Sequence, residues 1–309
     1  MTTNLEQHKL VAIGGGTGLP LVLRAACSLG IQPTAVVAMA DDGGSTGRLR
    51  RELGMLPPGD VRNCLTTLAS PDRFELTHLV DYRFNEGEGI AGHSLGNLMI
   101  AAAADDLNSF EQAVKLFEDL LQVRGRVLPS TFENTTLHGF DRKGEEIYGQ
   151  ASLTCSSTAI AKVELSPKEP AANPEAVDAL RHADSIVITP GSLFTSIIPN
   201  LLIPGIISAI QDSSARVVYC CNVANMKGET ANFTALDYIT TLNHYGLHKR
   251  IDAVMLPYSM HDEDSVQSLE AQGIQVVVTA LAAAQNTQHH DEHKLASALP
   301  ALIQPPCEQ

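Results

Sequence analysis

Short apolar runs alternate along the chain with stretches of helical periodicity. Strands are predicted over residues 9–13, where Leu10 to Ile13 are apolar, and over residues 35–40, which are all apolar. Residues 19–29 between them carry apolar side chains at helical spacing. This order of strand, helix and strand predicts a β-α-β unit with parallel strands and a right-handed crossover.

Residues 94–107 and 110–121 have helical spacing, and after Pro174 the alternation of strands and helices returns. The strands expected there cover residues 185–189, 216–221, 251–256 and 274–280, and the helices cover 174–182, a stretch from 191, 234–245 and 264–272. Such alternation is typical of a Rossmann-like α/β fold, a doubly wound and mostly parallel sheet with helices on both faces.

The middle of the chain has a different pattern. Residues 135–140 and 145–153 alternate around the turn Asp141-Arg142-Lys143-Gly144, which predicts a β-hairpin, and residues 160–165 add a third strand. We therefore expect a single domain over residues 1–309 with a small antiparallel insertion near residues 130–166.

The composition of the chain, and above all its charge, argues against some classes of binding partner. The chain has 309 residues, 44% of them apolar and 18% charged, with a formal net charge of −14. An acidic surface argues against nucleic acid or anionic membrane as a partner, because phosphate backbones are bound by Lys and Arg. No apolar stretch reaches the roughly 18 residues of a membrane span, and the polar start is unlike a signal peptide. We expect a cytoplasmic protein without a membrane span.

The metal-binding and redox residues form no recognisable pattern. Six cysteines occur without C-x-x-C spacing, which indicates reduced thiols; they are Cys27, Cys64, Cys155, Cys220, Cys221 and Cys307. The histidines of residues 289–293 are interpreted as part of a polar linker before the last helix, and no metal site is defined.

A glycine-rich turn follows the first predicted strand and leads into a helix; it consists of Gly14, Gly15, Gly16, Thr17 and Gly18. Backbone N–H groups converge at such a helix N-terminus and its dipole favours an anion, so the turn predicts a phosphate site. The run matches neither the G-x-G-x-x-G fingerprint nor a Walker loop. The alternative is a tight turn in which the glycines only permit positive φ.

The second predicted strand ends in another glycine-rich turn, formed by Asp42, Gly43, Gly44 and Ser45. A carboxylate at the end of the second strand is where doubly wound proteins bind a ribose hydroxyl, and glycines let a ligand approach the backbone. Because neighbouring parallel strands end at one edge of the sheet, we expect both turns to line one crevice.

Residues 57–64 combine a Pro-Pro-Gly turn with Asp60, Arg62 and Asn63. Arg62 or Arg48 would neutralise a diphosphate through forked hydrogen bonds. For Arg48 the alternative is a solvated helix face.

A predicted helix start over residues 92–98 carries His93, Ser94 and Asn97. Ser94 has the position of a helix cap, and His93 and Asn97 lie one turn apart on the same side. We favour a binding role for this group, although a histidine at a helix start is often structural.

The strand over residues 185–189 is followed by a turn with Gly191 and Ser192, and Thr195 lies in the helix start beyond it. This repeats the opening pattern, as expected for a ligand that lies across the two halves of the sheet. Asn222 would lie at the end of the adjacent strand. A nucleophilic role for Ser192 would need a paired base, and the G-x-S-x-G elbow is absent.

Seven ordered blocks between residues 10 and 256 resemble the signature segments of the gluconeogenesis factor family, which is related to 2-phospho-L-lactate transferase. Five are the turns and helix starts described above. The other two are Tyr82-Arg83-Phe84 and Arg124-Gly125-Arg126-Val127-Leu128-Pro129.

The resemblance implies a bacterial protein that binds a nucleotide sugar, UDP-N-acetylglucosamine in studied members, and that regulates cell shape and wall synthesis during gluconeogenic growth. Related transferases bind a guanosine diphosphate compound with a metal ion in the corresponding crevice. The matching positions imply ligand contacts at Gly14 to Gly18, Asp42 to Ser45, Asn63, Asn97, Gly191, Ser192 and Thr195.

One departure affects the sugar-binding end of the site. Asn225-Met226-Lys227-Gly228-Glu229-Thr230 stands where the family often has Thr-Gln-Pro-Gly-Glu-Thr, and Phe233 occupies a tyrosine position. The identity of the sugar therefore stays open.

Two functions remain open. In the first, a regulator holds a nucleotide diphosphate sugar and acts through a protein partner. In the second, a transferase uses a nucleotide diphosphate donor, with Mg²⁺ held by Asp42 or Asp60. We also expect a homo-oligomer.

Overall fold

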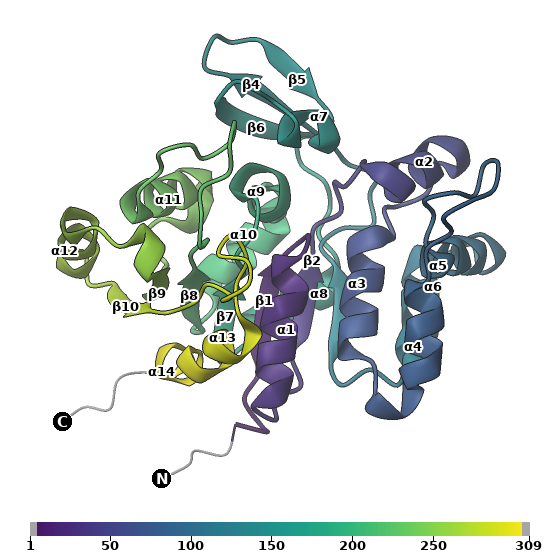
Figure 1. The fold of residues 1–309 in the computed structure, drawn as a ribbon, viewed down its shortest axis with the longest axis horizontal. Coiled ribbons are helices and arrows are strands. Elements are labelled where there is room, and N and C mark those ends of the chain that lie inside the picture. Colours follow the sequence, from purple (N-terminus) through teal and green to yellow (C-terminus); the bar gives the residue numbers. More distant parts are fainter. Residues whose placement is uncertain (1–4, 305–309) are drawn as a thin grey trace.

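A parallel sheet of seven strands runs through the centre of the computed structural model, which describes residues 5–304 (Figure 1). Cys307 and the rest of the tail from residue 305 therefore lie outside the described residues. The strand order is β10-β9-β8-β7-β1-β2-β3. The strands are β1 (Leu10–Gly14), β2 (Thr34–Val37), β3 (Arg126–Pro129), β7 (Ser185–Ile188), β8 (Arg216–Cys220), β9 (Ala253–Pro257) and β10 (Gln275–Thr279).

Successive side chains of the central strand enter two different cores. In β1, Val11 and Ile13 belong to one hydrophobic core and Leu10 and Ala12 to the other. Because side chains alternate along a strand and both faces are buried, β1 reads as a continuous apolar run. This confirms the predicted fold class, a doubly wound α/β sheet with helices on both faces.

Each face of the sheet is covered by its own set of helices. One core contains side chains of α1 (Gly18–Ser28), α3 (Gly59–Leu68), α4 (Phe74–Asp81), α5 (Leu95–Asp106), α6 (Phe110–Leu121), α13 (Glu292–Ala298) and α14 (Pro300–Ile303). The other core contains side chains of α8 (Pro174–Arg181), η2 (Leu193–Ile197), α9 (Ile198–Leu201), α10 (Pro204–Asp212), α11 (Ala235–Leu242) and α12 (Glu263–Ala271).

The predicted insertion is a three-stranded antiparallel sheet of order β5-β4-β6, drawn at the top of Figure 1 beside α2 (Gly44–Leu53). Its strands are β4 (Thr136–Asp141), β5 (Glu146–Tyr148) and β6 (Ile160–Ser166). The second hairpin strand is shorter than expected. It ends at Tyr148 because Gly149 turns the chain at φ +89° into the helix α7 (Gln150–Thr154).

The chain winds in two directions from the middle of the sheet. From β1 it proceeds through β2 to β3, and from β7, which pairs with β1 on its other side, it proceeds through β8 and β9 to β10. β1 and β7 therefore flank the topological switch point, and the crevice beyond their carboxyl ends is where such sheets bind ligands.

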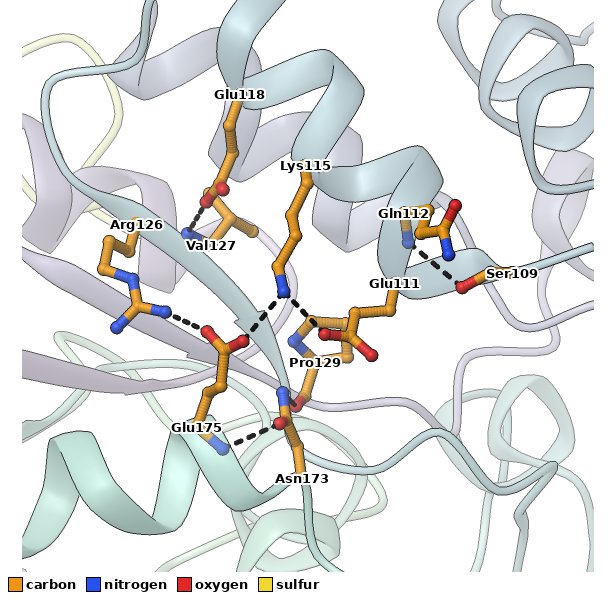
Figure 2. Close-up of polar contacts among 10 residues, drawn as sticks. All are labelled: Ser109, Glu111, Gln112, Lys115, Glu118, Arg126, Val127, Pro129, Asn173 and Glu175. Carbon is orange, nitrogen blue, oxygen red and sulfur yellow. Dashed lines mark hydrogen bonds and ion pairs between the residues drawn. The ribbon is translucent and has the colours of Figure 1, made fainter. Parts of the chain in front are cut away.

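The outer edge of β3 is closed by side chains (Figure 2). Val127 donates its backbone N–H to Glu118 of α6 at 2.6 Å, and the carbonyl oxygen of Pro129 accepts from Asn173 Nδ2 at 2.9 Å. Glu175 also pairs with Lys115 and Arg126. Edge strands protected in this way are poor templates for pairing with another chain.

Within residues 5–304, no single helix combines the length and apolar character needed to cross a membrane. In the same part of the chain, the two helical segments Leu193–Leu201 and Pro204–Asp212 are together long and apolar enough to cross a membrane. They are bent by 75° to each other.

Candidate functional site

A cavity of about 540 Å³ opens at the switch point, between the turns that follow β1 and β7. Its walls come from five segments of the chain: Gly15 to Gly18 with Leu21 and Arg24; Gln150 and Thr154; Pro190 to Ser192 with Thr195 and Ser196; Asn222 to Ala224 with Met226; and Gln288 to His290. The turns predicted at the ends of β1 and β7 therefore meet in one place.

The glycines after β1 allow the two halves of the sheet to approach closely. A Cβ atom on Gly18 would lie 1.7 Å from the Pro190 carbonyl oxygen, and one on Gly14 would lie 2.0 Å from Thr189 Oγ1. Gly16 has φ +60°, in the region that only glycine adopts readily. Close packing and backbone conformation thus account for these three glycines, whether or not a ligand is bound.

Asp60 lies directly beneath the glycine turn and is partly buried. Its Oδ2 accepts the Gly16 N–H at 2.7 Å, so this amide donates to the protein and not into the cavity. Burial raises the pKa of the Asp60 carboxyl to about 6, against an ordinary value of 3.8. The amides of Thr17 and Gly18, at the N-terminus of α1, are the remaining donors expected for a phosphate.

Asn222 holds the second turn in position. Its side-chain amide donates to the Gly191 carbonyl oxygen and accepts the Gly191 N–H, both at 2.8 Å. The sequence placed Asn222 correctly at the end of the strand next to β7, and its side chain orients the backbone beside the cavity.

Ser192 and Thr195 line the cavity in front of a buried carboxylate. Ser192 Oγ donates to Glu229 Oε1 at 2.6 Å, and the backbone N–H of Phe194 donates to the same oxygen at 3.2 Å. Glu229 is 4% exposed, and its Oε2 is buried without a hydrogen-bond partner. Burial raises the pKa of Glu229. The sequence did not indicate this pairing, because Glu229 is 37 residues from Ser192.

The predicted turn after β2 lies outside the cavity lining. Both carboxylate oxygens of Asp42 accept backbone N–H groups of α7, from Gln150 at 3.0 Å and Ala151 at 2.8 Å. Gly43 donates to Asp41, and Gly44 adopts φ +48°. Asp42 thus anchors the insertion, and through Gln150 it supports one wall of the cavity.

Ser45, Asn63 and Asn97 form a second polar cluster, also outside the cavity lining. Ser45 Oγ lies 2.8 Å from His93 Nδ1 and accepts from Asn97 Nδ2 at 3.3 Å. Arg62 donates to both Asn97 and Asn63. These polar groups bond to one another, and their predicted contact with a ligand stays a prediction.

The C-terminal wall of the cavity was missed by sequence reasoning. The histidines of residues 289–293 were interpreted as part of a linker, but His290 Nε2 donates to the Cys221 carbonyl oxygen at 3.0 Å and fixes this segment beside β8. Burial lowers the pKa of His290, which favours the neutral imidazole. Nothing in the local pattern distinguishes these residues from an exposed linker.

Among residues 5–304 no group of three or more His, Cys, Asp or Glu side chains is arranged to hold a metal ion. A magnesium site at Asp42 or Asp60 would need phosphate oxygens as additional ligands, which is the usual mode of Mg²⁺ binding with nucleotides. Magnesium stays a prediction.

A second cavity, of about 730 Å³, lies between α2, α5 and the start of α6, and Leu53, Leu98 and Ala102 contribute to its lining. It contains none of the predicted site residues. The cavity at the switch point is therefore the candidate site.

The fold and this cavity define a doubly wound α/β protein with its candidate site at the topological switch point. A family model described as 2-phospho-L-lactate transferase CofD matches residues 10–296. The chain belongs to the gluconeogenesis factor family, within this CofD-like group.

Similar proteins support this assignment. A protein of Bacillus subtilis named gluconeogenesis factor is 37% identical over 314 residues, with 96% of this chain and 99% of that protein covered. A protein of the same name from Halalkalibacterium halodurans is 43% identical over 244 residues, covering 79% and 76%. A relative from a Nostoc species is 45% identical over 249 residues, which span 80% of this chain and only 54% of that protein.

A crystal structure of a Bacillus halodurans protein has the same architecture. Its TM-score is 0.88 at 37% identity, and the match covers 95% of this chain and 99% of that chain.

Proposed function

We propose that this chain binds a nucleotide diphosphate sugar in the switch-point cavity and acts as a regulator. UDP-N-acetylglucosamine is the first candidate, because the family resemblance implies it. The same resemblance suggests a role in cell shape and cell-wall precursor supply during gluconeogenic growth, in the cytoplasm, through a regulatory protein partner and as a homo-oligomer.

One observation carries the proposal: the turns after β1 and β7 meet around a single cavity of about 540 Å³. Cavities of some hundreds of cubic ångströms at a switch point are typical small-molecule sites. The N-terminus of α1 faces this cavity at Thr17 and Gly18, and the first turn of α1 carries no acidic residue. The Gly16 N–H donates to Asp60, and the amides of Thr17 and Gly18 are the donors proposed for an anion.

The second candidate is a transferase that uses a nucleotide diphosphate donor. The match to the 2-phospho-L-lactate transferase family model favours it. Ser192 and Glu229 lie 2.6 Å apart beside the cavity, so a hydroxyl with a paired base is present. The two candidates differ in turnover: a regulator holds the ligand unchanged, whereas a transferase consumes it.

Calorimetry tests the proposal. We expect saturable 1:1 binding of UDP-N-acetylglucosamine, with GDP, other nucleotide sugars and Mg²⁺ as comparisons. Absence of binding for every nucleotide would overturn both candidates. Consumption of the bound ligand in a mass-spectrometric assay would favour the transferase.

A further inference from the structure

Two helix N-termini face the cavity, and they differ in charge. The N-terminus of α1 has no acidic side chain in its first turn. At the other, the buried Glu229 carboxylate accepts the Phe194 N–H and the Ser192 hydroxyl. A carboxylate at a helix N-terminus satisfies the amides and dipole that would otherwise attract a phosphate. At the β1 turn the Asp60 carboxylate accepts only the Gly16 N–H, so the amides of Thr17 and Gly18 remain for a ligand.

Glu229 also determines where the hydroxyl protons of this wall point. An ionised carboxylate only accepts hydrogen bonds, so Ser192 must donate its single hydroxyl proton to Glu229. The contact between the Ser192 and Thr195 hydroxyls then needs its proton from Thr195. Both protons are then used within the protein. Thr195 Oγ1 lies 3.5 Å from Thr154 Oγ1, and it keeps a lone pair that can accept from a ligand.

A ligand group at this wall must therefore donate hydrogen bonds. We propose that the Ser192 and Thr195 wall recognises the hydroxyl groups of a sugar and rejects phosphate. Glu229, which lies behind this wall, causes the preference because it takes the hydroxyl proton of Ser192. The diphosphate is then oriented toward Thr17 and Gly18, across the cavity.

The burial of Glu229 supports a specific role for its charge. Its Oε2 has no hydrogen-bond partner and is inaccessible to solvent. An unsatisfied buried carboxylate oxygen is destabilising, and a structural helix cap would be served as well by a smaller, fully satisfied side chain. The inference rests on the proposed function, because it assigns a direction to the ligand of that same cavity.

The test compares UDP-N-acetylglucosamine with UDP, which lacks the sugar, by calorimetry on the full chain. In Glu229→Gln, the side-chain amide can donate to Ser192, so the hydroxyl protons are released toward the cavity. We expect the affinity for UDP-N-acetylglucosamine to fall about tenfold, the scale of one hydrogen bond, while the affinity for UDP stays the same or rises.

Glu118→Gln is the matched control, because Glu118 is another partly buried glutamate that accepts a backbone N–H, far from the cavity (Figure 2). It should leave both affinities unchanged. Thr195→Val, nearly equal in volume, removes the open acceptor and should reproduce the selective loss if Glu229→Gln does not fold.

The outcomes separate the two proposals. If the unaltered protein binds neither nucleotide, the proposed function fails and this assignment fails with it. Suppose instead that the unaltered protein binds both UDP-N-acetylglucosamine and UDP. If Glu229→Gln and Thr195→Val then change the two affinities by the same factor, or leave them unchanged, the wall does not recognise the sugar. Only this inference is then overturned.

Discussion

At the residue scale, Gly18 has no room for a side chain and Gly16 has some. A Cβ on Gly18 would overlap the Pro190 carbonyl group, whereas one on Gly16 would meet only Ser196 Oγ, at 3.5 Å. The positive φ of Gly16 is nevertheless unfavourable for alanine. The two glycines therefore restrict the turn for different reasons.

We expect Gly18→Ala to destabilise the protein by about 3 kcal/mol or more, because the backbone of the neighbouring turn must move. Gly16→Ala should cost about 1 kcal/mol, the strain of one left-handed residue. Urea unfolding measures both changes. Equal losses for the two variants would contradict the steric account of Gly18.

Asp60 makes the stability depend on pH. Its pKa is about 6 in the folded protein and about 3.8 in the unfolded chain, so between these values the folded state binds more protons. The stabilisation is present below pH 3.8 and is lost as the pH rises through 6. Asn does not titrate, so the Asp60→Asn variant should not lose stability in this way as the pH rises.

The free energy of unfolding of Asp60→Asn, relative to the unaltered protein, should therefore increase by about 2 kcal/mol between pH 4 and pH 7. Denaturant titrations at the two pH values measure the change. If the unfolding free energies of the two proteins differ by the same amount at both pH values, burial does not raise the pKa of Asp60.

At the element scale, the closed edge of β3 combines strong and weak contacts (Figure 2). Asn173 is buried, caps α8 through the Glu175 N–H and donates to the Pro129 carbonyl oxygen. The ion pairs of Glu175 with Lys115 and Arg126 are largely exposed. Exposed ion pairs contribute little, because solvent screens them.

Asn173→Ala should consequently cost about 2 kcal/mol of unfolding free energy, since it leaves a buried carbonyl oxygen and a helix N-terminus unsatisfied. Glu175→Ala should cost less than about 1 kcal/mol although it removes two ion pairs. Thermal and urea unfolding of both variants check the order. The reverse order would mean that the ion pairs stabilise this edge.

The sequence pattern predicted most central strands because fully buried parallel strands are continuous apolar runs. The sequence pattern did not predict β3, because its apolar run consists only of Val127 and Leu128, between Arg126 and Pro129. The helix α7 was expected to be strand, because alternation continues past Gly149 while the positive φ there is invisible in the pattern.

Strand-end reasoning also predicted which residues lie together at one edge of the sheet. It brought Gly191, Ser192 and Asn222 to the cavity, because carboxyl ends of parallel strands share one edge. It could not reveal that Asp42 is bonded to α7 or that Glu229 stands behind Ser192. Those contacts depend on how distant loops fold back, for which local spacing carries no signal.

At the scale of the whole molecule, the proposed function places anion binding by an acidic chain in one cavity. The net charge of −14 disfavours anions over most of the surface. The N-terminus of α1, whose first turn carries no acidic residue, faces the cavity between the two halves of the sheet. A diphosphate is then expected there and not at the larger cavity beside α5.

The most direct test is calorimetric titration with UDP-N-acetylglucosamine of two tryptophan variants. Ala224→Trp fills the switch-point cavity, whereas Ala102→Trp fills the cavity between α2 and α5. The account predicts that Ala224→Trp abolishes binding and that Ala102→Trp binds like the unaltered protein. Undiminished binding by a folded Ala224→Trp variant would contradict it.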